Sequence, residues 1–368
     1  MRKAKLSVQP DVDSVLKMNE PYTPRPEDYE KASKSEKEGF ITKTKSVSYW
    51  ADAWRRLKKN KVAMVALVVI VLLLLFAFVG PLFTNYTYSI QIRGEENWPP
   101  FWEQPSERVL SKAEADGISF NRWTHPLGTD NLGRDNLTRL MYGTRISLCI
   151  GLIATLIVVI IGSLVGSIAG YAGGAVDVVI MRITEIIYSI PDVLVVLLLS
   201  TVMKQGMTSY INANTGWWPE LLNTLGGNLI GIFITFGLIY WVSMARIIRG
   251  QVLMLKQQEY VTAARALGAS GSRIIKRHLL PNCIGQLVVT ACLQIPSAIF
   301  LESFLSFLGM GVSSPLTSLG SMASEGLSGI YTYPYRLIVP AVVLSILILS
   351  FNLFGDGLRD ALDPRLKK

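Results

Sequence analysis

The chain has 368 residues, of which 50% are hydrophobic, and 36 Lys and Arg against 27 Asp and Glu give it a formal net charge of +9. Soluble domains have a similar apolar fraction, so composition alone does not decide the class. The positive charge does not indicate a nucleic-acid-binding protein, because the basic residues flank apolar runs and no nucleic-acid-binding motif is present. Cys149, Cys283 and Cys292 lack metal-ligand spacing and are interpreted as small packing residues.

The N-terminal region has two parts. Residues 1–45 are rich in Lys, Glu, Pro and Ser with few large apolar side chains, so we predict a disordered cytoplasmic tail. Residues 46–61 instead repeat apolar side chains at helical spacing among basic ones: Val47, Trp50, Trp54 and Leu57. This pattern is typical of an amphipathic helix in contact with membrane lipid, with its tryptophans at headgroup depth. Docking to a cytoplasmic partner is the alternative.

Six apolar segments are predicted to cross the membrane. The first, residues 62–83, lies in a run without charge from Val62 to Ile92 that can span a hydrocarbon core about 30 Å thick. A second charge-free run extends from Ile146 to Val176, and weaker segments follow: 183–203, 229–245, 284–308 and 337–354. We therefore predict an all-α membrane protein whose last five spans form a core over residues 146–355.

The basic residues indicate how the spans are oriented. They gather before the first span, after the fourth, and near the end of the chain, where residues 356–368 form a predicted tail. The connections 204–228 and 309–336 carry one basic residue each, and the long 84–145 loop holds seven basic residues against eight acids. Both termini are therefore predicted to be cytoplasmic, and the 84–145 loop external.

The external loop itself combines two kinds of sequence. Residues 97–116 form a polar insertion that contains Pro and several acids, and its structure stays open. The stretch from His125 to Leu148 predicts a short surface helix that leads into the second span and ends near Gly143. His125 has no second His or Cys at ligand spacing, so no metal site is expected there.

Two carboxylates at predicted membrane depth are candidates for a translocation path, because polar groups are costly there and often functional. Asp192 follows Pro191, where a helix can break, and a cap for the resumed helix is the alternative interpretation. Glu302, near the outer end of the fifth span, either faces a water-filled path or hydrogen-bonds between helices.

Sequence motifs for catalysis are absent. The chain contains no G-x-x-x-x-G-K-[ST] loop, no H-E-x-x-H, no G-x-S-x-G and no Cys–His constellation. Without a phosphate-binding loop it has no evident means of binding ATP, so we do not expect it to be an enzyme.

The loop between the fourth and fifth spans, residues 246–282, predicts a helical knob. Glu259 to Leu267 are mostly strong helix formers, Gly268 can end that helix, and a second short helix is predicted from about Ser270 to a stop at Pro281. Small and basic side chains would let another protein approach closely and supply polar contacts: Ala263, Ala264, Ala266, Arg265, Arg273 and Arg277. The pattern favours a docking element over a simple linker.

The stretch "EYVTAARALGASGSRIIKRHLLPN" resembles the cytoplasmic coupling motif (EAA…G…LP) of permease subunits of ABC importers. Four further stretches resemble the C-type permease of dipeptide and oligopeptide importers: "WADAWRRLKKNK", "HPLGTDNLGRDNLTRLMYGTRISL", "ESFLSFLGMGVSSP" and "NLFGDGLRDALDPRL". The motif's alanines, glycine and Leu-Pro fall on Ala263, Ala264, Gly268, Leu280 and Pro281. Its acid falls on Thr262, a departure from the pattern, and Glu259 lies one helical turn earlier.

The resemblance implies the type I ABC importer permease fold in a bacterial plasma membrane. It also implies a second, B-type permease, two ATPase subunits that bind ATP and Mg, and an extracellular or periplasmic substrate-binding protein that delivers a peptide. The chain itself would bind no cofactor, metal or nucleic acid and would dock an ATPase through residues 259–281. Import of nickel, glutathione or another small solute stays open. A self-contained secondary transporter is a further alternative, with Asp192 and Glu302 as its candidate ion-binding residues.

Overall fold

The computed structural model describes residues 48–312, 314 and 316–362. The tail predicted over residues 1–45 lies outside the described residues. The described part is built from helices and contains no β-strand. Six of its helices are long and apolar enough to cross a membrane: Lys61–Phe78, Asn136–Ala172, Asp192–Ala213, Gly227–Leu255, Gly271–Phe307 and Tyr335–Leu362. The predicted all-α class with six membrane spans is confirmed.

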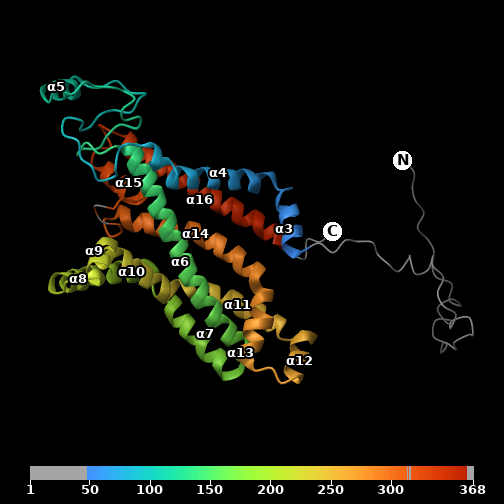
Figure 1. The fold of residues 1–368 in the computed structure, drawn as a ribbon. Coiled ribbons are helices and arrows are strands. Elements are labelled where there is room, and N and C mark those ends of the chain that lie inside the picture. The colour runs from blue at the N-terminus through green and yellow to red at the C-terminus, as the bar shows by residue number, and fades with distance from the viewer. Residues whose placement is uncertain (1–47, 313, 315, 363–368) are drawn as a thin grey trace, which may run out of the picture. The chain divides into compact units, whose positions relative to one another are not determined.

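The first and last spans run side by side (Figure 1). Helix α4 (Lys61–Phe78) begins after Asn60, whose side-chain oxygen accepts a hydrogen bond of 3.1 Å from the Ala63 N–H. Its partner α16 (Tyr335–Leu362) continues past the end predicted for the last span, because its final turns pack against α3 (Tyr49–Leu57). The amphipathic helix expected before the first span therefore exists, and it is seated on the end of the last one.

The loop between the first two spans contains more structure than its sequence indicated. After the 3₁₀ turn η2 (Gly80–Phe83), the polar insertion includes helix α5 (Glu107–Ala115). Val109 and Ala113 of this helix pack against Trp98, which is 1% exposed, and these residues form a small core of their own. The insertion is therefore a folded element in the described structure.

The second span, α6 (Asn136–Ala172), is a single continuous helix, so the prediction of a separate surface helix ending near Gly143 is wrong. Gly143 is buried, and a Cβ atom built there would lie 3.2 Å from the carbonyl carbon of Ser318. The glycine thus lets α6 pack closely against the start of α15 (Leu319–Leu327), and its role is packing within the helix.

The third span is divided, which shifts it from the predicted range 183–203. Helix α7 (Gly174–Tyr188) ends before Pro191, and α8 (Asp192–Ala213) resumes directly after it. Proline cannot donate a backbone hydrogen bond, so a break at this point follows from the sequence. Three more helical segments and one π-helical turn lead to the loop after the fourth span: α9 (Trp217–Leu225), α10 (Gly227–Thr235), η3 (Phe236–Tyr240) and α11 (Trp241–Leu255).

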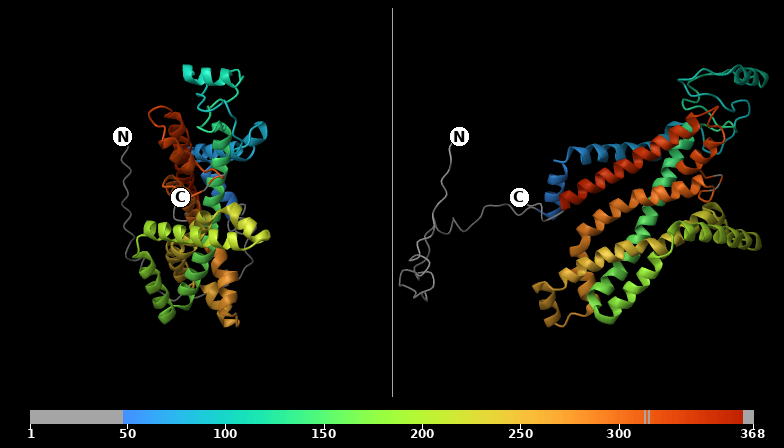
Figure 2. Two further views of the ribbon diagram at one scale, coloured as in Figure 1. Left: turned by 90° about the vertical axis from the view of Figure 1, so that its left-hand side faces the viewer. Right: turned by 180° about the vertical axis from the view of Figure 1, so that it is seen from behind.

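The fifth span begins well before its predicted start. Helix α12 (Glu259–Ala266) is followed by a helical run from Gly271 to Phe307. This run consists of four consecutive segments: α13 (Gly271–Ile274), the π-turn η4 (Ile275–Leu279), the 3₁₀ turn η5 (Leu280–Cys283) and α14 (Ile284–Phe307). Helices α5 and α12 lie at opposite ends of the helical body (Figures 1 and 2).

Candidate functional site

The turn after α12 has the geometry of a Schellman motif. Gly268 adopts φ +79°, a left-handed conformation that glycine occupies without strain. Its N–H donates to the Arg265 carbonyl at 3.0 Å, and the Ala269 N–H donates to the Ala264 carbonyl at 3.0 Å. These two bonds satisfy carbonyls that would otherwise be free at the end of the helix. The helix therefore ends at Gly268, as its sequence predicts.

The inner face of this turn is anchored in the hydrophobic core of the protein. Val261 of α12 and Ile274 of α13 are both 0% exposed and belong to the largest hydrophobic cluster of the described residues. The guanidinium of Arg265 lies over the ring of Tyr171 at 5.7 Å, and Lys256 donates to the Gly170 carbonyl at 2.8 Å. The segment is thus fixed to the end of α6 by apolar burial and by two cations.

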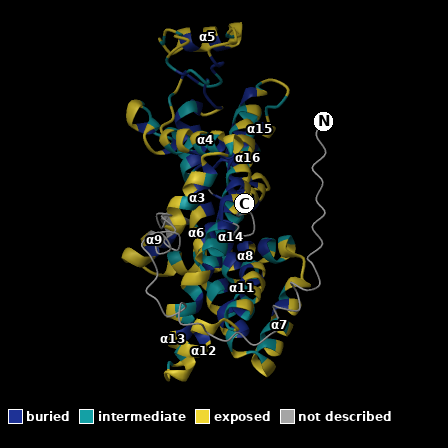
Figure 3. Ribbon diagram, turned by 90° about the vertical axis from the view of Figure 1, so that its right-hand side faces the viewer, coloured by how far each residue is buried: buried dark blue, intermediate teal, exposed yellow. Residues whose placement is uncertain are grey.

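The outer face of the same segment is open (Figure 3). Of the predicted docking residues, Glu259, Thr262, Ala263, Arg265, Gly268, Arg273 and Pro281 are exposed, while Ala264 and Leu280 are half-buried. Leu267, which caps α12, is 87% exposed although it is a large apolar side chain. An apolar tip flanked by small and charged side chains can bury itself against another protein.

The predicted stop at Pro281 is wrong, because the chain remains helical through this residue. Proline removes one backbone donor and its ring occupies space near the preceding turn. The helix accommodates it by widening into the π-turn η4 and then tightening into the 3₁₀ turn η5. Asn282 donates from its side chain to the His278 carbonyl at 2.6 Å. The docking segment therefore continues without interruption into α14.

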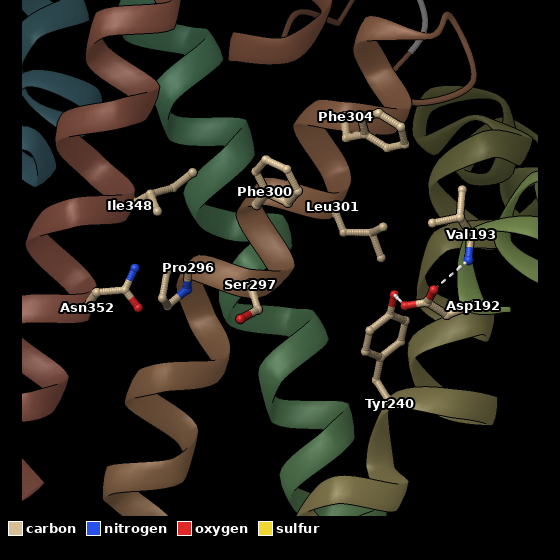
Figure 4. A pocket seen from close by; sticks show the side chains of 10 residues that line it. All are labelled: Asp192, Val193, Tyr240, Pro296, Ser297, Phe300, Leu301, Phe304, Ile348 and Asn352. Atoms are coloured by element: carbon tan, nitrogen blue, oxygen red, sulfur yellow. Dashed lines mark hydrogen bonds between the residues drawn. The ribbon is translucent and has the colours of Figure 1, made fainter. Parts of the chain in front are cut away.

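Asp192 lies on a cavity of about 470 Å³ between the spans. Figure 4 shows the side chains that line it, which come from α8, η3, α14 and α16: Asp192, Val193, Tyr240, Pro296, Ser297, Phe300, Leu301, Phe304, Ile348 and Asn352. One carboxylate oxygen accepts a hydrogen bond from the Val193 N–H at 2.8 Å, and the other accepts from the Tyr240 hydroxyl at 2.8 Å. Asp192 is thus the first residue of α8, accepts a bond from the next backbone N–H, and also faces the cavity.

Glu302 does not line this cavity. It is 0% exposed and accepts hydrogen bonds from Ser147 of α6 at 2.9 Å, from Ser303 at 3.2 Å and from Ser306 at 2.7 Å. Of the two interpretations open at the sequence level, the hydrogen bond between helices is the one that this geometry matches. Asp192 and Glu302 are therefore not brought together.

A buried polar cluster organises the loop that leads into α6. The ring of His125 is 1% exposed, with Nδ1 2.8 Å from Asp135 and Nε2 2.7 Å from Glu95. Burial alone would lower the pKa of His125, but hydrogen bonds and charge from the two carboxylates outweigh it and raise the pKa above its ordinary value. Asp135 also caps α6 by accepting from the Thr138 N–H at 2.7 Å. His125 thus links Glu95 to the start of α6.

A second set of ion pairs ties the loop before α6 and the first turn of α6 to Glu325 of α15. Asp130 accepts from Arg134 at 2.5 Å and from Arg139 at 2.7 Å, and both arginines also reach Glu325. Among the described residues, no group of three or more His, Cys, Asp or Glu side chains could hold a metal ion.

Sequence reasoning missed two residues of these sites, and each left a faint signal. Tyr240 is a polar-tipped aromatic residue inside an apolar span, and the π-turn that ends at this residue could not be read from the sequence. Leu267 directly precedes the glycine that is predicted to end the helix. A large apolar side chain at such a turn indicates a contact with another protein when no neighbouring residue covers that side chain.

Comparison with known proteins gives a consistent set of similarities. Residues 162–368 match the family model described as "Binding-protein-dependent transport system inner membrane component", and residues 48–100 match "N-terminal TM domain of oligopeptide transport permease C". The chain is 41% identical over 324 residues to the oligopeptide transport system permease protein OppC of Bacillus subtilis, covering 88% of this chain and 92% of that protein.

Two other proteins show related similarity. The dipeptide transport system permease protein DppC of Bacillus subtilis is 41% identical over 333 residues, which cover 90% of this chain and 91% of that protein. A chain of the solved MetNI methionine ABC transporter aligns with a TM-score of 0.46 at 18% identity and covers 61% of this chain and 96% of that chain.

Proposed function

The chain belongs to the family of binding-protein-dependent transport system inner membrane components, and we propose that it is a permease subunit of an ATP-driven importer of dipeptides and oligopeptides. In this proposal it forms half of the translocation pathway beside a B-type permease. An extracellular or periplasmic binding protein delivers the peptide, and two partner ATPases bind and hydrolyse ATP with Mg. Both termini and the 259–281 segment face the cytoplasm.

The observation that carries the proposal is the two-faced character of the 259–281 segment. Its inner face is held in the core by Val261 and Ile274, and its outer face presents Leu267 at 87% exposure. A partner that seats on the outer face would move the inner face with it, because closely packed interiors transmit displacement. This is the arrangement required of an element that couples an ATPase to membrane helices.

Peptide is the favoured solute because the named relatives with 41% identity are oligopeptide and dipeptide permeases. The test is uptake of labelled peptide into proteoliposomes that hold this chain, its second permease, the ATPases and the binding protein. We expect uptake that depends on ATP and on all subunits. Uptake of nickel or glutathione in place of peptide would overturn the choice of solute.

Docking and orientation can be tested in the same complex. In a background whose three cysteines are replaced by serine, Leu267→Cys should cross-link to a cysteine on the ATPase and should react with an impermeant thiol reagent only from the cytoplasmic side. Leu110→Cys on α5, also an exposed leucine on a helix, is the matched control and should react only from outside. Labelling of both positions from the same side would overturn the proposed orientation.

A further inference from the structure

The carboxylate of Asp192 faces the cavity without a cationic partner. It forms no salt bridge with any lysine or arginine in the described part of the chain. Its hydrogen bonds come from the Val193 N–H and the Tyr240 hydroxyl. A carboxylate has about four lone-pair sites, so these two bonds leave acceptor capacity unused. A charge between membrane helices is costly unless a cation or water-filled space compensates it.

The surroundings of Asp192 are suited to a cationic ligand. Asp192 and Tyr240 lie where the cavity of about 470 Å³ meets a second hollow of about 460 Å³, since both side chains line both spaces. Phe300 and Phe304 line the cavity of about 470 Å³, and the planes of their rings are nearly parallel, with an interplanar angle of 13°. Aromatic faces attract cations, and a cavity of this size can hold a small peptide. Ser297 and Asn352 add polar groups to the same wall (Figure 4).

The bond to the first turn of α8 accounts for only part of this geometry. It uses one carboxylate oxygen, because the Val193 N–H donates to Oδ1. The other oxygen, Oδ2, is oriented by the hydroxyl of Tyr240, which lies 48 residues away on the π-turn η3. Such π-turns are rare and occur frequently at functional sites. Two distant elements therefore converge on a carboxylate oxygen beside the cavity.

We propose that Asp192, oriented by Tyr240, binds the free α-ammonium group of a peptide as it passes through the cavity. The inference rests on the proposed function and adds the chemical group that the permease recognises. The ammonium donates hydrogen bonds to the carboxylate and lies against the aromatic wall, so the ligand supplies the missing positive charge. Tyr240 is a positioning residue that keeps Oδ2 directed toward the cavity.

The experiment compares trialanine with N-acetyl-trialanine in proteoliposomes that contain the complete importer. Each peptide is supplied at a concentration that loads the binding protein equally, as checked by titration of that protein alone. Asp192→Asn retains an oxygen that can accept from the Val193 N–H and removes the charge, so it separates the two roles of the residue. We expect this variant to lower trialanine uptake about tenfold, the loss typical of a charge-assisted hydrogen bond, and to leave N-acetyl-trialanine uptake unchanged.

Two further variants sharpen the comparison. Tyr240→Phe should lower trialanine uptake by a smaller factor, about two- to fivefold, again with little effect on the acetylated peptide. Ser297 lines the same cavity, so Ser297→Ala serves as the control. This variant should change the uptake of both peptides by the same factor. Equal loss for both peptides in Asp192→Asn would overturn the inference and leave the residue with a structural role.

The remaining outcomes are also decisive. If Asp192→Asn no longer copurifies with the second permease, the carboxylate pairs with a cation of that subunit and the inference is wrong. If the wild-type complex transports neither peptide, the proposed peptide function fails and the inference fails with it. If the wild type transports both peptides and the variant does not discriminate between them, only the inference fails.

Discussion

Replacing Gly268 with valine tests whether the turn after α12 transmits force. The glycine has φ +79°, and a Cβ atom built there meets no heavy atom within 4 Å. The substitution therefore causes no clash with neighbouring groups, and its cost is conformational. A β-branched residue in the left-handed region costs roughly 1–2 kcal/mol. If the turn opens instead, two hydrogen bonds of 3.0 Å are lost, at about 0.5–1.5 kcal/mol each.

Either route destabilises the native turn by a similar amount. Since 1–2 kcal/mol corresponds to a factor of about 5–30 in an equilibrium, the equilibrium constant for the native turn should fall by that factor. Transport and the stimulation of ATP hydrolysis by loaded binding protein should decrease together, whereas membrane insertion and peptide binding by the binding protein should not change. Reconstituted uptake and stimulated ATPase activity measure the two effects side by side.

The chain provides a matched control at the opposite end of the molecule. Gly117 ends α5 with φ +70°, has the same pair of turn hydrogen bonds, and also has no heavy atom within 4 Å of an added Cβ. Gly117→Val thus carries the same conformational cost outside the docking segment and should leave stimulated ATP hydrolysis intact. Normal transport by Gly268→Val while it remains bound to its ATPases would refute the reasoning.

Four further predictions concern other parts of the chain. Glu259→Ala should reduce transport far less than Gly268→Val, because exposed charge contacts contribute only about 0–1 kcal/mol. The purified chain alone should hydrolyse no ATP, and turnover by a preparation free of contaminating ATPase would contradict this. Because folding raises the pKa of His125, this residue stabilises the folded protein fully below its ordinary pKa near 6.5, and the stabilisation is lost as pH rises through the folded pKa. The melting temperature in detergent should therefore fall over this pH range, and His125→Gln should abolish the dependence. Serine at Trp50 and Trp54, exposed by 47% and 45%, should make α3 more accessible to protease in proteoliposomes, whereas a serine at an exposed tryptophan on α9 should not.

The helix-ending role of Gly268 could be predicted from sequence because its cause is local. A run of helix formers followed by glycine sets the turn through backbone preference alone, and the two turn bonds span only a few residues. The same holds for the break before Asp192, which Pro191 imposes directly. Both features follow from the backbone preferences of one residue, so they do not depend on what the segment packs against.

Features that depend on distant partners could not be predicted. His125 offered no metal-ligand pattern, and its actual partners, Glu95 and Asp135, are 30 and 10 residues away. Gly143 has the local sequence of a helix end, but close packing against α15 overrides that preference. At Pro281 the π-turn upstream absorbs a residue that ends most helices. In each case tertiary packing decided between structures that local sequence left open.

The cavity lies where two hydrophobic cores meet, and this position connects it with the docking segment. Val261 and Ile274 share one core with Phe236 beside Tyr240 and with Leu301 of the cavity wall. Ile348, on the α16 wall, packs instead against a second core formed with α4 and α15 and with other residues of α6 and α14. Displacements pass readily within one packed core, whereas two cores can shift relative to each other. We therefore expect a push on α12 to move the Tyr240 wall against the α16 wall, so that docking at one end changes the width of the cavity around Asp192.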